Sequence, residues 1–224
     1  SFKNRFACSD IGTIEIRFNA TDNWTNSVEG SYQNFTLRKD TTSVDSAIAG
    51  DGALINREGT VNTTMILRSK DVENLSNYLG TGRNASLFVT TNGAAYRLDH
   101  NRTTNSTGHV TFEFDPDCNY GVGDQLWRGG PNNDVCYLDS NSTDFAVAIT
   151  GQLRQNLTSP TQSQVIPVGN VLTFNVTSPS DCSNENNLTG VNVTIEIIGP
   201  AQNETCTCLL KNRSLIARKG SKNF

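Results

Sequence analysis

The sequence predicts an all-β protein built from two antiparallel β-sandwich domains with at most one short helix. Three observations lead to this prediction. Short segments in which apolar and polar residues alternate recur along the 224 residues, as in strands with one buried face. Clusters of Gly, Asn, Asp and Pro separate them, which favours turns between successive strands. The composition is polar but weakly charged, with 18% charged residues, where about a quarter is usual.

The strand signal recurs along the whole chain and is interrupted once. A single short helix is expected at 71–79, DVENLSNYL, because Val72, Leu75 and Leu79 fall on one side of a helical turn. The expected strands are 12–18, 34–38, 61–67, 86–91, 109–114, 145–150, 171–177, 191–198 and 205–210.

A domain boundary is expected where alternation is lost, between Gln152 and Val165, around Pro160. The prediction is an N-terminal arm or strand at 1–20, a first sandwich at 21–152, a linker at 153–164 and a smaller second sandwich at 165–224. The second domain is short for a seven-stranded sandwich. A sandwich that lacks a strand leaves an open edge, which a strand from another copy can fill.

Acceptor triplets for N-glycosylation, Asn-x-Ser/Thr, are unusually dense. With 27 Asn and 45 Ser plus Thr, random order gives about five such triplets, yet the chain has fifteen. This excess predicts an extracellular protein carrying covalent N-glycans over most of its surface. The acceptors are Asn19, Asn23, Asn34, Asn62, Asn74, Asn84, Asn101, Asn105, Asn141, Asn156, Asn175, Asn187, Asn192, Asn203 and Asn212.

The middle residue of a triplet indicates how a strand accommodates the sugar. Residues i and i+2 share a strand face, so Asn and Thr point outward together while the middle residue points inward. The middle residues expected inside are Phe35, Ala85, Val176 and Val193. In 191–198, the expected core side chains are Val191, Val193, Ile195 and Ile197, and the expected outward ones are Asn192, Thr194 and Glu196.

Six cysteines in an extracellular chain predict disulfides. They are Cys8, Cys118, Cys136, Cys182, Cys206 and Cys208. Cys118 and Cys136 bracket a turn-rich segment and are expected to pair. Cys206 and Cys208 point the same way on one strand, so they are expected to take Cys182 and Cys8 as separate partners. Two alternatives stay open for Cys8, a bond within the chain and a bond to a neighbouring subunit. A metal site is disfavoured because no His lies near the CTC segment.

Charge and hydropathy exclude several classes of protein. The net charge is −4 and no basic stripe runs through the chain, which argues against nucleic-acid binding. No apolar run approaches the roughly 20 residues of a membrane span. From Cys208 onward the chain is basic without an acid, which indicates a solvated terminus or an electrostatic latch onto another copy. The basic residues there are Lys211, Arg213, Arg218, Lys219 and Lys222.

Part of the chain is similar to known surface proteins. The stretch 110–153, VTFEFDPDCNYGVGDQLWRGGPNNDVCYLDSNSTDFAVAITGQL, resembles the recurring end of Ig-like repeats in large archaeal surface proteins. The elements that carry the resemblance are Cys118, Tyr120, Gly123, Gln125, Trp127, Cys136, Tyr137, Gly151 and Leu153. The later Asp181, Cys182 and GVNVTIEI are similar to the start of the next repeat. The resemblance covers roughly 110–198 and implies an exported, glycosylated Ig-like architecture without catalytic residues.

No arrangement of side chains predicts catalysis or a cofactor. His100 and His109 lie among acceptor triplets, and no serine lies in Gly-x-Ser-x-Gly. Five oxygen-bearing side chains are calcium candidates, although turn caps explain them better: Asp115, Asp117, Asp139, Asn141 and Asp144. Trp24 and Trp127 are interpreted as core residues in preference to sugar-stacking platforms.

The expected function is that of a structural subunit of an extracellular, N-glycosylated filament or surface coat. Its expected partners are copies of itself, joined head to tail, with strand donation as one way of joining them. The alternative is a cell-surface adhesin or a viral envelope binding module.

Overall fold

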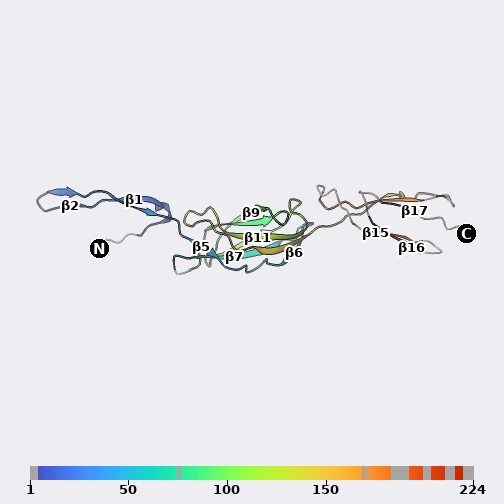
Figure 1. The fold of residues 1–224 in the computed structure, drawn as a ribbon, viewed down its shortest axis with the longest axis horizontal. Coiled ribbons are helices and arrows are strands. Elements are labelled where there is room, and N and C mark those ends of the chain that lie inside the picture. The colour runs from blue at the N-terminus through green and yellow to red at the C-terminus, as the bar shows by residue number, and fades with distance from the viewer. Residues whose placement is uncertain are drawn as a thin grey trace. The chain divides into compact units, whose positions relative to one another are not determined.

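The protein is described by a computed structural model, which covers residues 5–74, 77–167, 170, 172–182, 192–198, 203–209 and 215–218. The regular secondary structure of these residues is almost entirely β-strand, so the predicted fold class is confirmed (Figure 1). Their helical structure is one 3-10 turn, η1 (Cys8–Asp10). The chain divides into two compact units. Unit 1 comprises Ser1–Ile55, Asn62–Asp115 and Gly123–Ile149, and unit 2 comprises Asn56–Val61, Pro116–Val122 and Thr150–Phe224.

The N-terminal strands form a two-stranded ribbon. Strand β1 (Gly12–Ile16) pairs antiparallel with β4 (Gln33–Leu37), and β2 (Asn19–Thr21) pairs with β3 (Ser27–Glu29). The ring of Phe35 packs edge-on against Phe6, with centroids 5.5 Å apart. The first predicted strand therefore pairs with a later segment of its own chain.

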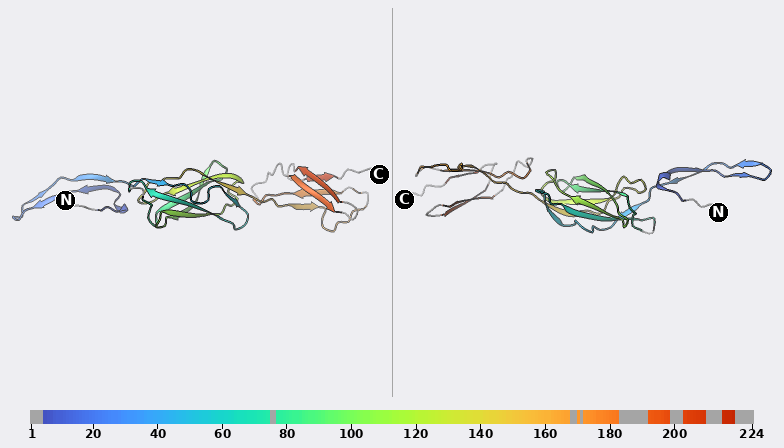
Figure 2. Two further views of the ribbon diagram at one scale, coloured as in Figure 1. Left: turned by 90° about the horizontal axis from the view of Figure 1, so that it is seen from below. Right: turned by 180° about the vertical axis from the view of Figure 1, so that it is seen from behind.

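Two antiparallel sheets pack face to face in unit 1 (Figure 2). One sheet has the order β10 (His109–Phe114), β7 (Thr63–Asp71) and β5 (Thr42–Val44). The other has the order β6 (Ala53–Asn56), β12 (Phe145–Thr150), β11 (Gly123–Pro131), β8 (Asn84–Thr90) and β9 (Tyr96–Thr103).

The core of this sandwich comes from alternate residues of its strands, as period-2 patterning requires. The fully buried side chains include Met65, Leu67, Leu87, Val89, Val110, Phe112, Phe114, Trp127, Val147 and Ile149. Each contributes about 1.5–3 kcal/mol through burial. The Trp127 ring lies 4.8 Å from that of Phe145, and its Nε1 donates to the Gly50 carbonyl at 3.2 Å.

The helix expected at 71–79 is wrong. Strand β7 continues through Asp71, and a turn follows. The Asp71 carboxylate accepts hydrogen bonds from the amides of Glu73 and Asn74, both at 3.0 Å. This side chain offers the backbone a turn in place of a helix. The amide of Leu79 donates a hydrogen bond to the Ser69 carbonyl at 3.0 Å, and the Leu79 side chain is fully buried. Leu75 and Ser76 lie outside the described residues.

Unit 2 contains a three-stranded sheet, β13 (Asn156–Ser159), β14 (Thr173–Thr177) and β17 (Leu215–Arg218), and the hairpin β15 (Asn192–Ile198) and β16 (Asn203–Leu209). Strand β13 falls in the segment expected to be a linker. In β15, Thr194 and Glu196 are exposed while Ile195 is half-buried, which agrees with the predicted alternation. The side chains predicted at 191–193 and at 197 lie outside the described residues.

The predicted disulfide pairing is wrong. The structure joins Cys8 to Cys136 and Cys118 to Cys182, with Cα atoms 4.9 and 5.5 Å apart. The segment between Cys118 and Cys136 is mostly strand β11, and nine extended residues span about 30 Å. The two cysteines therefore lie at opposite ends of a strand. Because Cys8 bonds to Cys136 within the chain, the alternative of a bond between Cys8 and a neighbouring subunit is also wrong. The expected bond between Cys8 and a cysteine of the CTC segment is wrong for the same reason. The side chains of Cys206 and Cys208 lie outside the described residues.

Candidate functional site

Eleven acceptor asparagines have side chains that the structure describes, and none of these eleven is buried. Asn175 is half-buried. The exposed ones are Asn19, Asn23, Asn34, Asn62, Asn74, Asn84, Asn101, Asn105, Asn141 and Asn156. The side chains of Asn187, Asn192, Asn203 and Asn212 lie outside the described residues.

The predicted inward position of the middle residue is confirmed where it is described. Ala85 and Val176 are buried, and Phe35 is half-buried against Phe6. Val193 lies outside the described side chains. Strand periodicity therefore places each of these acceptors on the face opposite the core.

Two acceptor triplets lie side by side on neighbouring strands of the five-stranded sheet. In the antiparallel register of β8 and β9, Asn84 is opposite Thr103 and Ser86 is opposite Asn101. The hydroxyl residue of each triplet thus faces the acceptor of the other. Ser86 is 2% exposed, and its hydroxyl hydrogen-bonds Asn101 Oδ1 at 2.7 Å.

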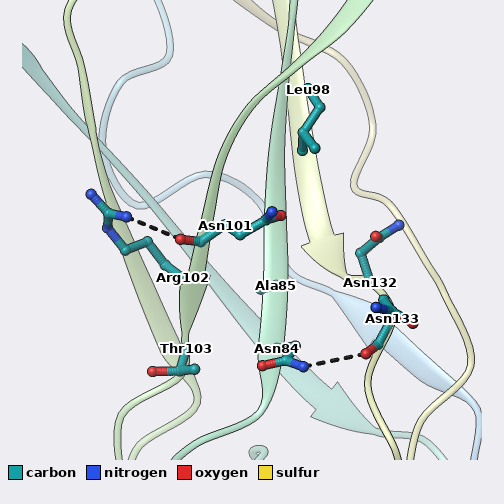
Figure 3. Close-up of a pocket in the computed structure, with 8 residues that line it drawn as sticks. All are labelled: Asn84, Ala85, Leu98, Asn101, Arg102, Thr103, Asn132 and Asn133. Carbon is teal, nitrogen blue, oxygen red and sulfur yellow. Dashed lines mark hydrogen bonds between the residues drawn. The ribbon is translucent and has the colours of Figure 1, made fainter.

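A shallow pocket of about 460 Å³ opens on the outer face of these two strands (Figure 3). Its lining residues come from β8, β9 and the turn after β11: Asn84, Ala85, Leu98, Asn101, Arg102, Thr103, Asn132 and Asn133. Asn84 Nδ2 donates to the Asn133 carbonyl at 3.2 Å. Figure 3 shows Asn101 on one side of Asn84 and both Asn132 and Asn133 on the other. The wall therefore combines four asparagine side chains with the apolar Ala85 and Leu98 and the charged Arg102.

A cation–π contact links β9 to β11 across the same sheet. The guanidinium of Arg128 lies over the Tyr96 ring, 4.0 Å from its centroid. Burial, followed by the neighbouring Asp144 carboxylate, raises the pKa of Tyr96 to about 12. Tyr96 lies on β9, the strand that also carries the acceptor Asn101.

A buried ion pair organises part of unit 2. Arg57 Nε and Nη2 donate to the two Asp181 oxygens at 3.0 and 2.8 Å. Arg57 Nη1 donates to the Tyr120 carbonyl at 2.9 Å. The hydrogen bonds from Arg57 hold the pKa of Asp181 well below its usual range. The sequence offered no signal for this pair, because the two residues are 124 positions apart.

Two of the calcium candidates accept hydrogen bonds from nearby backbone amides, and Asp117 does so as a turn cap. Asp117 accepts from the Asn119 amide at 2.8 Å and from Asn119 Nδ2 at 2.7 Å. Asp139 accepts from the Asn133 amide at 2.8 Å. Among the described residues no three His, Cys, Asp or Glu side chains are grouped to hold a metal ion.

The histidines are held locally. His100 Nδ1 contacts the carboxylate of Asp99, the residue before it. His109 Nδ1 hydrogen-bonds the Thr107 hydroxyl at 2.7 Å. Each histidine thus contacts a side chain one or two positions away on its own strand or the turn beside it.

The two tryptophans have different environments. The core interpretation is confirmed for Trp127, which is 0% exposed, and wrong for Trp24, which is 83% exposed. Trp24 lies in the turn between β2 and β3, beyond the ends of both strands, which leaves its ring in solvent. Its backbone amide donates a hydrogen bond to the Asp22 carboxylate at 2.8 Å. Of the basic tail, Arg218 lies in β17, and its other basic residues lie outside the described ranges.

Comparison with known proteins gives structural likenesses only. No protein-family model and no curated protein matches the chain. One similar solved structure is a tetra-tandem repeat in the extending region of a large adhesion protein, at 16% identity and a TM-score of 0.37, covering 92% of this chain and 47% of that one. Another is a Ca²⁺-stabilized adhesin of an Antarctic bacterium that binds ice, at 13% identity and a TM-score of 0.27, covering 92% and 48%. The chain thus spans about half the length of each. Within the described ranges no helix is long and apolar enough to cross a membrane.

Proposed function

We propose that this chain is a structural subunit of an extracellular, N-glycosylated filament or surface coat, and that it has no enzymatic role. The observation that carries the proposal is the placement of the acceptors. Ten of the eleven acceptors with described side chains are exposed, and the residues between acceptor and hydroxyl point inward on β4, β8 and β14. Glycans on most of the triplets would cover the surface of the protein without disturbing its cores.

The two intrachain disulfides support an extracellular location, because such bonds persist in oxidising compartments. They close loops across 128 and 64 residues of sequence. In the chain-entropy model, loops of this size stabilise the fold by about 4–5 kcal/mol each. A subunit of an exposed surface layer needs this kind of durability.

The N-terminal ribbon supports self-association. A two-stranded ribbon is at best marginally stable on its own. The ribbon also carries exposed apolar side chains: Phe18 at 72%, Trp24 at 83%, Val28 at 70% and Tyr32 at 60% exposure. Insertion of this ribbon into the C-terminal sheets of another copy would bury them, and each would add about 1.5–3 kcal/mol. Such head-to-tail contacts propagate without closing.

Electron microscopy of native material, together with glycopeptide mapping, tests the proposal. We expect filaments or sheets with most acceptors occupied. The double variant Phe18→Ser with Val28→Ser should reduce assembly in light scattering. The matched control, Leu54→Ser with Val135→Ser, removes apolar side chains that are 71% and 65% exposed elsewhere in unit 1, and should assemble normally. Isolated particles that bind another surface through one sugar-free patch would instead favour the adhesin alternative.

A further inference from the structure

We propose that the pocket on the outer face of β8 and β9 seats the innermost sugar of an N-linked glycan attached to Asn101, and that Asn84 is a wall of this seat, not a second attachment point. The inference rests on the glycosylation in the proposed function and goes beyond it by assigning one glycan a binding site on the protein. The starting observation is that two acceptor asparagines line the same pocket.

The two acceptors differ in the freedom of their amide nitrogens. Asn84 Nδ2 donates to the Asn133 carbonyl at 3.2 Å. Asn101 is held through its oxygen, which accepts from Ser86 at 2.7 Å, and within the described part of the chain its Nδ2 has no partner. A glycan bond forms at Nδ2 and leaves Oδ1 able to accept. Glycosylation of Asn101 therefore preserves the hydrogen bond that orients it.

The short distance between the two acceptors also favours one glycan in this pocket over two. Asn84 and Asn101 are diagonal neighbours in the register of β8 and β9, and such positions lie about 7–8 Å apart. Two sugars rooted that close would compete for one pocket of about 460 Å³. The Asn84 triplet also buries its hydroxyl residue, Ser86, to 2% exposure, whereas Thr103 of the Asn101 triplet is exposed.

The pocket wall matches the chemistry of a pyranose ring. A sugar presents hydroxyls on its edge and C–H groups on its faces, so it is bound by amides together with an apolar surface. Asn132 contributes an amide on the far side of Asn84 from Asn101 (Figure 3). Leu98, 47% exposed on the same strand as Asn101, contributes the apolar surface.

Site-resolved glycopeptide mapping of native protein tests the attachment point. We expect sugar on Asn101 and an unmodified Asn84, with loop acceptors such as Asn23 and Asn105 occupied. An occupied Asn84, or a bare Asn101 beside occupied loop acceptors, would overturn this inference alone. If no acceptor in the chain is occupied, the proposed function falls with it.

Thermal unfolding tests the seat. Thr103→Val removes the Asn101 triplet but keeps a β-branched residue in the strand. In glycosylated protein we expect a Tm loss of about 2–4 °C, the shift produced by the loss of about one hydrogen bond in a chain of this size. Asn23→Gln, which removes a sugar in the exposed ribbon, should leave Tm unchanged.

Two comparisons separate a seated sugar from a structural effect of the substitution. Thr103→Val should leave Tm unchanged in protein produced without glycosylation. Asn132→Ala should lower Tm in the glycosylated parent but add nothing to Thr103→Val, because both would remove the same contact. An equal Tm loss with and without sugar, or additive losses in the double variant, would rule out the seat.

Discussion

The ion pair between Arg57 and Asp181 offers a sharp test of what stabilises unit 2. The Arg57 side chain is 1% exposed and that of Asp181 is 5% exposed. The Arg57 guanidinium donates hydrogen bonds to both carboxylate oxygens of Asp181 and to the Tyr120 carbonyl, at distances of 2.8–3.0 Å. Removing one member leaves the other charge buried without its partner, which costs about 3–5 kcal/mol. We therefore expect Arg57→Met to lower the local unfolding free energy by that amount.

Hydrogen exchange followed by mass spectrometry measures this effect where it occurs. The Asp181 amide donates to the Gln152 carbonyl at 2.9 Å, and it exchanges when this part of unit 2 opens. A loss of 3 kcal/mol or more predicts exchange at least about 100-fold faster. An increase of less than tenfold in Arg57→Met would refute the reasoning.

The pair formed by Arg154 and Glu58 is the matched control. It lies in the same unit at the same 2.8 Å separation, but the Arg154 side chain is 65% exposed. Exposed pairs contribute about 0–1 kcal/mol, so Arg154→Met should speed exchange at Asp181 by less than tenfold. Replacing both buried charges, with Arg57→Met and Asp181→Leu, should recover much of the loss because no unpaired charge remains.

The direction of the Asp181 pKa shift determines how the stability contributed by this ion pair depends on pH. The pKa of Asp181 is lowered in the folded protein, so its contribution to stability is complete above the unfolded value of about 3.9. That contribution is lost as pH falls below about 4 toward the folded pKa. Urea unfolding between pH 7 and pH 2 should therefore show an acid loss in the parent that is smaller in the Arg57→Met, Asp181→Leu variant. Parallel curves would contradict this.

Three further predictions concern separate parts of the chain. Trp127→Ala should cost about 3–5 kcal/mol in urea unfolding, whereas Trp24→Ala should change stability by no more than about 0.5 kcal/mol; equal costs would contradict their assigned environments. Non-reducing peptide mapping of monomer should recover Cys8 linked to Cys136, and recovery of this bond only between two chains would show the pairing to be wrong. Ultraviolet titration should show a tyrosine step near pH 12 that Tyr96→Phe removes. The stability linked to that step is complete below about pH 10 and lost above it.

Strands with one buried face could be predicted because their side chains carry the signal. The segments 109–114 and 145–150 coincide with β10 and β12, and their inward residues are buried in the order the alternation predicts. The exposure of Asn34 and Asn84 follows from the same rule. The helix at 71–79 failed because the spacing of Val72 and Leu79 fits a helical turn, while the Asp71 carboxylate binds the amides that such a helix needs.

Strand β11 is poorly predicted because Trp127 is the one large apolar residue among its inward positions, and Gln125 and Gly129 occupy the positions on either side of it. A Cβ added at Gly129 would lie 2.6 Å from the Ser86 carbonyl oxygen and 2.9 Å from Leu67 Cδ1. Glycine there lets the two sheets approach, so it contributes close backbone packing but no hydrophobic signal. The sequence consequently predicts a turn-rich segment here, and the wrong pairing of Cys118 with Cys136 follows from that prediction.

Strand β9 was missed for a different reason, and that reason bears on the sugar. It is the edge of its sheet, and most of its residues are exposed, so YRLDHNRT shows no apolar alternation. An exposed edge is a template for unwanted pairing, which proteins block with charges or covering groups. A glycan on Asn101 would cover this edge, and one on Asn156 would cover β13, the edge of its own sheet. Sugar placed at these edges would leave one face of the N-terminal ribbon, the apolar face that carries Phe18 and Val28 opposite the acceptor Asn19, as a contact surface between copies. We therefore expect removal of the Asn101 and Asn156 triplets to produce disordered aggregation alongside ordered assembly.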